Sequence, residues 1–395
     1  MTHWRMLSSP LASLALGCAL LLAACGTPAP SGGTAGGAAP AKPAAPAQPA
    51  APAAPAVPAA PVQPAAPAAQ PTAPAQVETV QQGIVGVVSD AGIILGIERG
   101  YFREAGINIE GTRIGSASEA IQFLATGQLD VLGGGPGVGL YNAFAQGSRL
   151  RVVADKGSAI NERFGLNPLL VRKDLYDSGQ LREYSQLRGK RIAMSGLTTS
   201  NRVDVNKILA LGGLTEADIE LTAMSFPDMV PALANGNVDF AIGNEPPASV
   251  AVERGVAVRI ATVADIYPNH QVAVMMYSEQ FATQRREAAR RYMIAYLKGI
   301  RDYNDAFVAG RGKDEVVRIL GQTTGITDAA IYDKIVLPGL NPDGYVFKDT
   351  VAEDQTWFLR LGLQREAVDI DQLVDNQFVD YALQQLGRYQ APATR

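Results

Sequence analysis

The polar residues best placed to do chemistry follow short apolar segments that are typical of buried strands. In open α/β sheets, ligands bind beyond the carboxyl ends of the strands, where loops and helix N-termini converge. We therefore expect a ligand site at these loops, with glycines that let the backbone approach the ligand closely. The residues predicted to form it are Ser89, Asp90, Ser116, Gly134, Gly135, Pro136, Ser195, Gly196, Thr198, Thr199, Phe226, Asn244, Glu245 and Tyr267.

Two of these candidates are carboxylic acids, and they bear on the ligand. An ionised carboxylate only accepts hydrogen bonds, so Asp90 and Glu245 favour a pyrimidine, flavin or similar vitamin-like heterocycle rich in N–H and O–H groups. Phe226 or Tyr267 would stack on its ring. A sulfonate, taurine or nitrate ligand held by helix N-termini is the alternative, because either carboxylate could face a neighbouring arginine or solvent. Ser116, Ser200 and Asp90 could also serve only as helix caps.

Residues for catalysis are scarce. The histidines are His3 and His270, and the cysteines are Cys18 and Cys25. The metalloprotease, phosphate-loop and nucleophile-elbow motifs are all absent from the sequence. We therefore predict a binding protein and not an enzyme, with no cofactor and no metal site. His270 follows Tyr267-Pro-Asn, and we expect it at the surface or at a hinge.

A repeated stretch must position the candidate loops. Residues 119–136 predict a helix, a closing glycine at Gly127, a short buried strand and a Gly/Pro turn. Residues 229–247 repeat this pattern around Gly236, which indicates two similar α/β lobes around a shared cleft. Helix–Gly–strand is also a common connection, so coincidence is the alternative. Segment 83–88 is predicted as the first strand, and the aromatic residues of a helix after Arg285 are predicted as core.

The N-terminus is predicted to be a leader and a tether. Residues 1–24 carry a short apolar run that ends at Leu22-Ala23-Ala24-Cys25, like a bacterial lipoprotein signal. Cys25 would carry the lipid, and residues 25–76 are an Ala/Pro-rich tether of at most roughly 150 Å. The formal charge of −4 gives no basic excess for nucleic acid. The folded part, 77–389, is long enough for two cores.

Several motifs together resemble a known family. They are Gly100-Tyr-Phe-Arg-Glu-Ala-Gly106-Ile-Asn-Ile-Glu, Gly115-Ser-Ala-Ser-Glu-Ala, Leu187-Arg-Gly-Lys-Arg-Ile-Ala, both Ala-x-Gly-x-x-Asp stretches and the helical region from Arg290 to Phe307. In this order and spacing they resemble the periplasmic solute-binding proteins for sulfonates, nitrate, taurine and thiamine pyrimidines, in lipoprotein form. The resemblance covers nearly all of residues 83–389. The cytosolic pyrimidine synthases related to this family depend on cysteine and histidine clusters that this chain lacks.

The resemblance implies a fold, a function and partners. The fold is the α/β type II periplasmic-binding-protein fold, with lobe I at 77–170 plus 267–389 and lobe II at 171–266. The function is hinge closure around the Leu169 and Asp265–Asn269 crossings and delivery of a small molecule to an ABC permease with its ATPase. The protein is expected to be a monomer outside the cytoplasm, held at the cell membrane by lipid on Cys25. A ligand-sensing lipoprotein without a transport role is a further alternative.

Overall fold

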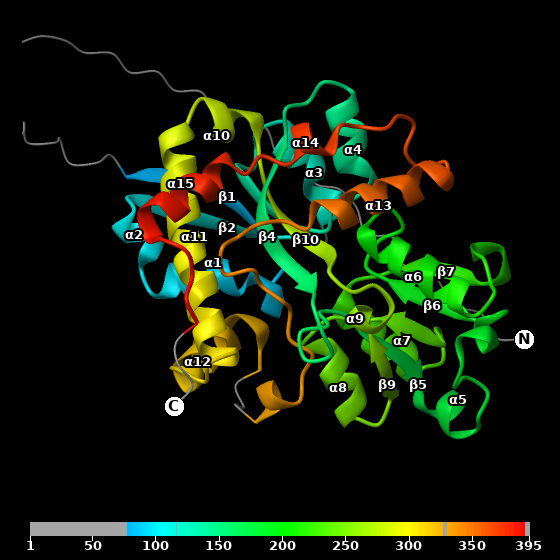
Figure 1. Ribbon diagram of the computed structural model, residues 1–395. Helices are drawn as coiled ribbons and strands as arrows, with labels where there is room; N and C mark the ends of the chain where they lie inside the picture. The colour runs from blue at the N-terminus through cyan, green and yellow to red at the C-terminus, as the bar shows by residue number, and fades with distance from the viewer. Residues whose placement is uncertain (1–76, 116, 327–329, 392–395) are drawn as a thin grey trace, which may run out of the picture. The chain divides into compact units, whose positions relative to one another are not determined.

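The computed structural model describes residues 77–115, 117–326 and 330–391. The predicted leader, the lipidation site at Cys25, the tether and Ser116 lie outside the described residues. The ten described strands form two five-stranded mixed sheets (Figure 1). The first sheet has the order β2 (Ile107–Arg113), β1 (Glu78–Ile84), β3 (Val131–Gly134), β10 (His270–Tyr277), β4 (Arg151–Ala159). The second has the order β7 (Glu220–Ala223), β6 (Arg191–Met194), β8 (Phe240–Ile242), β5 (Pro168–Arg172), β9 (Ala257–Thr262).

The two sheets have the same topology. In each one the fourth strand in spatial order, β10 or β5, runs antiparallel to both neighbours, and β10 joins the first sheet after all five strands of the second. The remaining strand pairs are parallel. This confirms the prediction of two similar α/β lobes. The exact domain limits given above stay a prediction.

Helices cover both sheets. Those that belong to the first sheet are α1 (Ala91–Glu98), α2 (Tyr101–Glu104), α3 (Ala117–Ala125), α4 (Val138–Ala145), α10 (Glu279–Thr283), α11 (Arg286–Phe307), α12 (Lys313–Thr324) and α15 (Gln377–Leu386). The second sheet has α5 (Lys173–Asp177), α6 (Ser200–Leu211), α7 (Phe226–Ala234), α8 (Pro247–Glu253) and α9 (Val263–Ile266). Near the C-terminus, α13 (Lys348–Arg360) and α14 (Ile370–Leu373) follow, and α13 packs against both β10 and α6.

The repeated stretch has a structural reason. Gly127 and Gly236 end α3 and α7 with positive φ angles of 75° and 69°, which glycine adopts without steric cost. The aspartate three residues after each glycine forms a hydrogen bond with the adjacent inner strand of its sheet, β1 or β6. Asp130 accepts a hydrogen bond from the backbone N–H of Gln81 at 2.9 Å, and Asp239 accepts one from that of Arg191 at 3.0 Å. The repeat thus fixes the positions of β3 and β8 and of the loops that follow them.

The first strand differs from its prediction. It spans Glu78–Ile84, and residues 88–90 form a turn of 3₁₀ helix instead of the end of a strand. The carboxylate of Asp90 accepts hydrogen bonds from the backbone N–H groups of Gly86 and Val87, at 2.6 and 3.1 Å. These bonds pull the chain out of the sheet after Ile84. The predicted strand is therefore right for residues 83–84 and wrong for 85–88, and within the apolar run Ile84 and Val85 are only half-buried.

The main core of the first lobe lies between its sheet, α1 and α11. Tyr292, Tyr296 and Tyr303 of α11 are fully buried there, so the prediction that these aromatics belong to the core is confirmed. A second core joins the other face of this sheet to β5, β6, α6 and α13. Because this core includes residues of both sheets, it supports the loops that meet between them.

Candidate functional site

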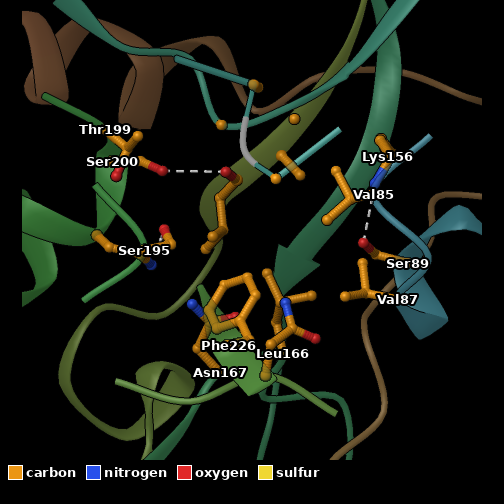
Figure 2. A pocket seen from close by; sticks show the side chains of 18 residues that line it. Val85, Val87, Ser89, Lys156, Leu166, Asn167, Ser195, Thr199, Ser200 and Phe226 are labelled. Atoms are coloured by element: carbon orange, nitrogen blue, oxygen red, sulfur yellow. Dashed lines mark hydrogen bonds between the residues drawn. The ribbon is translucent and has the colours of Figure 1, made fainter. Parts of the chain in front are cut away.

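A small pocket lies where loops of the two sheets meet (Figure 2). The space open to the centre of a water-sized molecule is about 60 Å³. Figure 2 shows Lys156 and Ser89 of the first lobe on one side, and Ser195, Thr199 and Ser200 of the second on the other. The lining residues are Val85, Val87, Ser89, Gly115, Ala117, Gly134, Gly135, Lys156, Leu166, Asn167, Ser195, Thr199, Ser200, Asn201, Phe226, Asn244, Val272 and Ala273.

Half of the predicted site residues reach this pocket. The residues that line it are Ser89, Gly134, Gly135, Ser195, Thr199, Phe226 and Asn244. They come from the ends of strands β1, β3, β6, β7 and β8 or from the turns that follow them. The rule that ligand loops follow the carboxyl ends of strands therefore finds these residues together.

Other predicted residues lie outside the pocket and have different partners. Pro136 is buried beside it. The carbonyl of Thr198 accepts a hydrogen bond from the backbone N–H of Val138 at 2.9 Å. The carbonyl of Gly196 accepts one from the hydroxyl of Thr199 at 3.0 Å. Tyr267 is stacked on His270 with ring centroids 4.3 Å apart. Its hydroxyl donates to Glu353, on α13, at 2.8 Å.

Neither predicted carboxylate faces the pocket. Glu245 is 1 % exposed and accepts hydrogen bonds from the backbone N–H groups of Ser249 and Val336, at 3.0 and 3.2 Å. Burial raises the pKa of Glu245 in spite of these bonds. Asp90 is fully buried and forms an ion pair with Lys156, with 2.9 Å between Oδ1 and Nζ. The argument for a heterocyclic ligand rested on these two acceptors, and it loses its basis.

Lys156 is the most important lining residue that the sequence analysis missed. Its side chain is 1 % exposed, and its Nζ donates to Ser89 Oγ at 3.0 Å. Lys156 is the one charged side chain among the described residues that line the pocket. An ammonium group has three donors, and Asp90 and Ser89 account for two of them. A lysine inside the apolar strand Val152-Val153-Ala154-Asp155-Lys156 was the signal that could have found it.

Glycine in the first lobe makes room for this lysine. A Cβ on Gly133 would lie 2.4 Å from Cε of Lys156, closer than real side chains approach. A larger residue in β3 at this position would therefore force the lysine side chain to move. The buried lysine and the glycine run Gly133-Gly134-Gly135 form one arrangement.

The second lobe presents the N-terminus of α6 to the pocket. Thr199 is its N-cap residue, with an extended backbone. The hydroxyl groups here already donate their hydrogens: Thr199 to Gly196 O at 3.0 Å, Ser200 to Val272 O at 3.0 Å and Ser195 to Asn201 Oδ1 at 2.6 Å. What they still offer a ligand is oxygen lone pairs, whereas the helix N-terminus offers N–H groups and a partial positive charge.

The lobes touch each other beside the pocket. Val138 N–H donates to Thr198 O at 2.9 Å, and Gly137 pairs with Thr199 as an isolated antiparallel bridge. A Cβ on Gly137 would lie 2.4 Å from Thr198 O, so glycine permits this close approach. The Ser200–Val272 hydrogen bond joins the same two lobes. The pocket is thus closed on this side.

A chain of hydrogen bonds leads from the pocket to a sealed ionic cluster. Asn201 receives the Ser195 hydroxyl and donates to Asp204 Oδ2 at 3.1 Å. Asp204 Oδ1 lies 2.7 Å from His270 Nδ1, and His270 Nε2 lies 3.0 Å from Asp354 Oδ2. All three charged side chains are fully buried, so the expectation of a surface position for His270 is wrong. His270 lies instead at the start of β10, where the chain returns to the first lobe.

The electrostatics of this cluster favour a protonated imidazole. Burial by itself would lower the pKa of His270, but the carboxylates of Asp354 and Asp204 outweigh it and raise the pKa to about 10. Burial raises the pKa of Asp354 to about 6, against the opposing effect of His270. Among the described residues, no group of three or more histidine, cysteine or carboxylate side chains is arranged so that it could hold a metal ion. None of the described helices is long and apolar enough to cross a membrane.

Comparison with known proteins places this arrangement in a family. The family model described as "NMT1/THI5 like" matches residues 88–305, more than half of the chain. A curated relative, the nitrate import ATP-binding protein NrtC of Synechococcus elongatus, is 27% identical over 271 residues. That match covers 65% of this chain but only 40% of the relative's length.

Solved structures with the same fold include both binding proteins and an enzyme. The alkanesulfonate-binding protein SsuA of Xanthomonas axonopodis pv. citri, bound to MOPS, has a TM-score of 0.63 at 19% identity and covers 77% of this chain and 100% of its own. The periplasmic nitrate-binding protein NrtA of Synechocystis PCC 6803 has a TM-score of 0.64 at 15% identity, with 80% and 90% covered. The desulfurization enzyme DSZB has a TM-score of 0.52 at 18% identity, with 78% and 99% covered.

Proposed function

We propose a function from the premise that the chain belongs to the NMT1/THI5-like family: it is the solute-binding component of an ABC importer and takes up a small anion. Lys156 carries this proposal. Its ammonium group is the charged side chain of the pocket, and the N-terminus of α6 adds a partial positive charge from the opposite lobe. The sulfonate- and nitrate-binding proteins of the same fold support the same ligand class, as does the likeness to an ATP-binding protein of nitrate import.

The heterocyclic ligand is not carried forward. Both carboxylates invoked for it have partners inside the protein, and Tyr267 stacks on His270 instead of facing the pocket. Size argues in the same direction. A water needs roughly 10–15 Å³ on this measure of volume, so about 60 Å³ accommodates on the order of four to six waters or a comparably small ligand. A flavin is far larger than this.

The residues favour binding over catalysis. The fold by itself does not decide, because DSZB shares it. In this chain no cysteine follows Cys25, and His270 is sealed between two carboxylates away from the pocket. The hydroxyl groups of Ser195, Thr199 and Ser200 donate to oxygen atoms of the protein, and no basic side chain of the described residues accepts from them. A nucleophile would need such a base.

The rest of the proposal concerns location and motion. Lipid on Cys25 would hold the protein outside the cytoplasm, the 25–76 tether would let lobes I and II reach the permease, and a monomer would suffice. Closure would turn on the two crossings. Leu166 and Asn269 lie there, and both have φ angles of 61°, which is uncommon for residues other than glycine. Strained backbone of this kind is typical of hinges and ligand sites.

A binding experiment tests the proposal. We expect ethanesulfonate, isethionate or nitrate to raise the melting temperature of the purified full-length chain, with saturation confirmed by calorimetry. A ligand at a hundred times its dissociation constant adds about 2.7 kcal/mol. Lys156→Met should abolish this effect, whereas Lys190→Met removes an equal charge from the surface of the second lobe and should preserve it. The absence of any anion effect on the wild-type chain would refute the proposed function.

A further inference from the structure

The amide of Asn167 has no hydrogen-bond partner although it is buried. Asn167 is 1 % exposed, it lines the pocket, and neither Nδ2 nor Oδ1 has a partner among the described residues. Leaving buried donors and acceptors unpaired is costly, and native proteins rarely do it without reason. Whichever way the amide is turned, it presents one unused acceptor and one unused NH₂ group.

The backbone holds this amide in place. Asn167 N–H donates to Gly165 O at 2.8 Å, and its carbonyl accepts from Val263 N–H at 3.0 Å. The preceding residue, Leu166, has the positive φ angle of 61° noted above and is 2 % exposed. Figure 2 shows Leu166, Asn167 and Phe226 grouped at one end of the pocket. A fixed backbone with an unpaired side chain indicates a group prepared for a partner that is not part of the protein.

The other lining groups define what this partner must be. Lys156 and the N-terminus of α6 are donors, and they match an anionic group. Ser195, Thr199 and Ser200 have already donated their hydrogens, so their oxygens, like Asn167 Oδ1, can only accept. A plain anion such as nitrate has no hydrogen for these acceptors. It would leave Asn167 Oδ1 buried and unpaired.

We infer that Asn167 is a specificity-determining residue that selects a small anion carrying its own O–H or N–H donor. The NH₂ group of Asn167 binds an oxygen of the ligand, and Oδ1 accepts from the ligand's hydroxyl or amino group. This inference rests on the proposed function and narrows it. It predicts discrimination between ligands that have the same charge and nearly the same size.

Matched ligand pairs test it. Isethionate is ethanesulfonate with one added hydroxyl, and glycolate is related to acetate in the same way, so the comparison works for either acidic group. We expect calorimetry on the full-length chain to show the hydroxylated member of at least one pair binding about tenfold tighter or more. This corresponds to about 1.4 kcal/mol. A site built to bind a hydroxyl discriminates strongly against the analogue that lacks it.

Variants separate this role from a structural one. Asn167→Leu keeps the approximate size and removes both unpaired atoms, so the ratio within each pair should fall to about one. The unliganded variant should melt at or above the wild-type temperature, since a buried polar group without partners is lost. Asn108→Leu, at an exposed position on β2, should retain the wild-type ratio.

The outcomes are distinct. Equal binding of both members of each pair by the wild-type chain overturns the role of Asn167 and leaves the proposed function standing. A ratio that survives in Asn167→Leu does the same. A chain that binds no anion at all overturns both statements.

Discussion

Two buried cations, Lys156 and His270, have different surroundings and different uses. Lys156 has one carboxylate partner, Asp90, and borders the pocket. His270 has two, Asp204 and Asp354, and borders no cavity of the described residues that we assign to a ligand. Lys156 is left with a donor for an outside partner, whereas each ring nitrogen of His270 lies beside a carboxylate of the protein. Burial of a charge therefore does not mark a binding site; an unsatisfied donor at a cavity does.

The largest effect expected from this comparison concerns the stability of the His270 cluster. His270→Phe leaves two buried carboxylates without a cation, and we expect a loss of about 3–5 kcal/mol in the free energy of unfolding. Denaturant unfolding of the full-length chain measures it. Adding Asp204→Asn and Asp354→Asn should restore at least half of the loss, because the uncompensated charges are gone. A single variant as stable as wild type would show that the cluster is not ionised.

The next effect concerns the Lys156 pair and separates binding from stability. Lys156→Met should weaken anion binding by about a hundredfold or more, which is about 2.7 kcal/mol, and it should also destabilise the fold because Asp90 stays behind unpaired. In Lys156→Met/Asp90→Asn we expect stability to recover while binding stays lost. Calorimetry and thermal unfolding together follow both quantities. Recovery of binding in the double variant would mean that the ammonium group is not the anion ligand.

The smallest effect is the dependence of stability on pH. Folding raises the pKa of His270 from its ordinary value of about 6.5 to about 10, because the carboxylates of Asp354 and Asp204 outweigh the effect of burial. A raised pKa means that the stabilisation is complete below about pH 6.5 and is lost as the pH rises towards 10. For each pH unit in this window the free energy of unfolding should therefore fall by up to about 1.4 kcal/mol, which is less than either effect above. His270→Phe lacks this slope if the assignment is right, and unfolding curves at pH 7, 8 and 9 compare the two chains.

Local pattern was sufficient for much of this fold. The repeated helix–glycine–strand stretches predicted both lobes, because positive φ at Gly127 and Gly236 and the short apolar strands leave a signature within twenty residues. The position of residues directly after apolar strands also predicted that Ser89, Gly135, Ser195 and Phe226 lie together at one site, and all four line the pocket. What it could not supply were partners distant in sequence.

The errors at the site follow from that limit. Asp90 looked like a ligand group because its partner, Lys156, is on another strand, and the backbone groups that bind Glu245 include Val336, 91 residues away. Asn167 follows no strand end and belongs to no motif. We assign it a role because its side-chain amide has no hydrogen-bond partner among the described residues. A sequence pattern cannot show that a partner is missing.

The late return of β10 to the first sheet sets the order in which the molecule can be completed as it is made. All five strands of the second sheet are available once Thr262 has emerged, whereas the first sheet, begun earlier, keeps a gap between β3 and β4 until Tyr277 follows. The lobe that starts first therefore finishes last. A chain that ended between Thr262 and His270 would contain every strand of the second sheet but would leave the first sheet without β10, so the first lobe depends on a segment made after the second lobe.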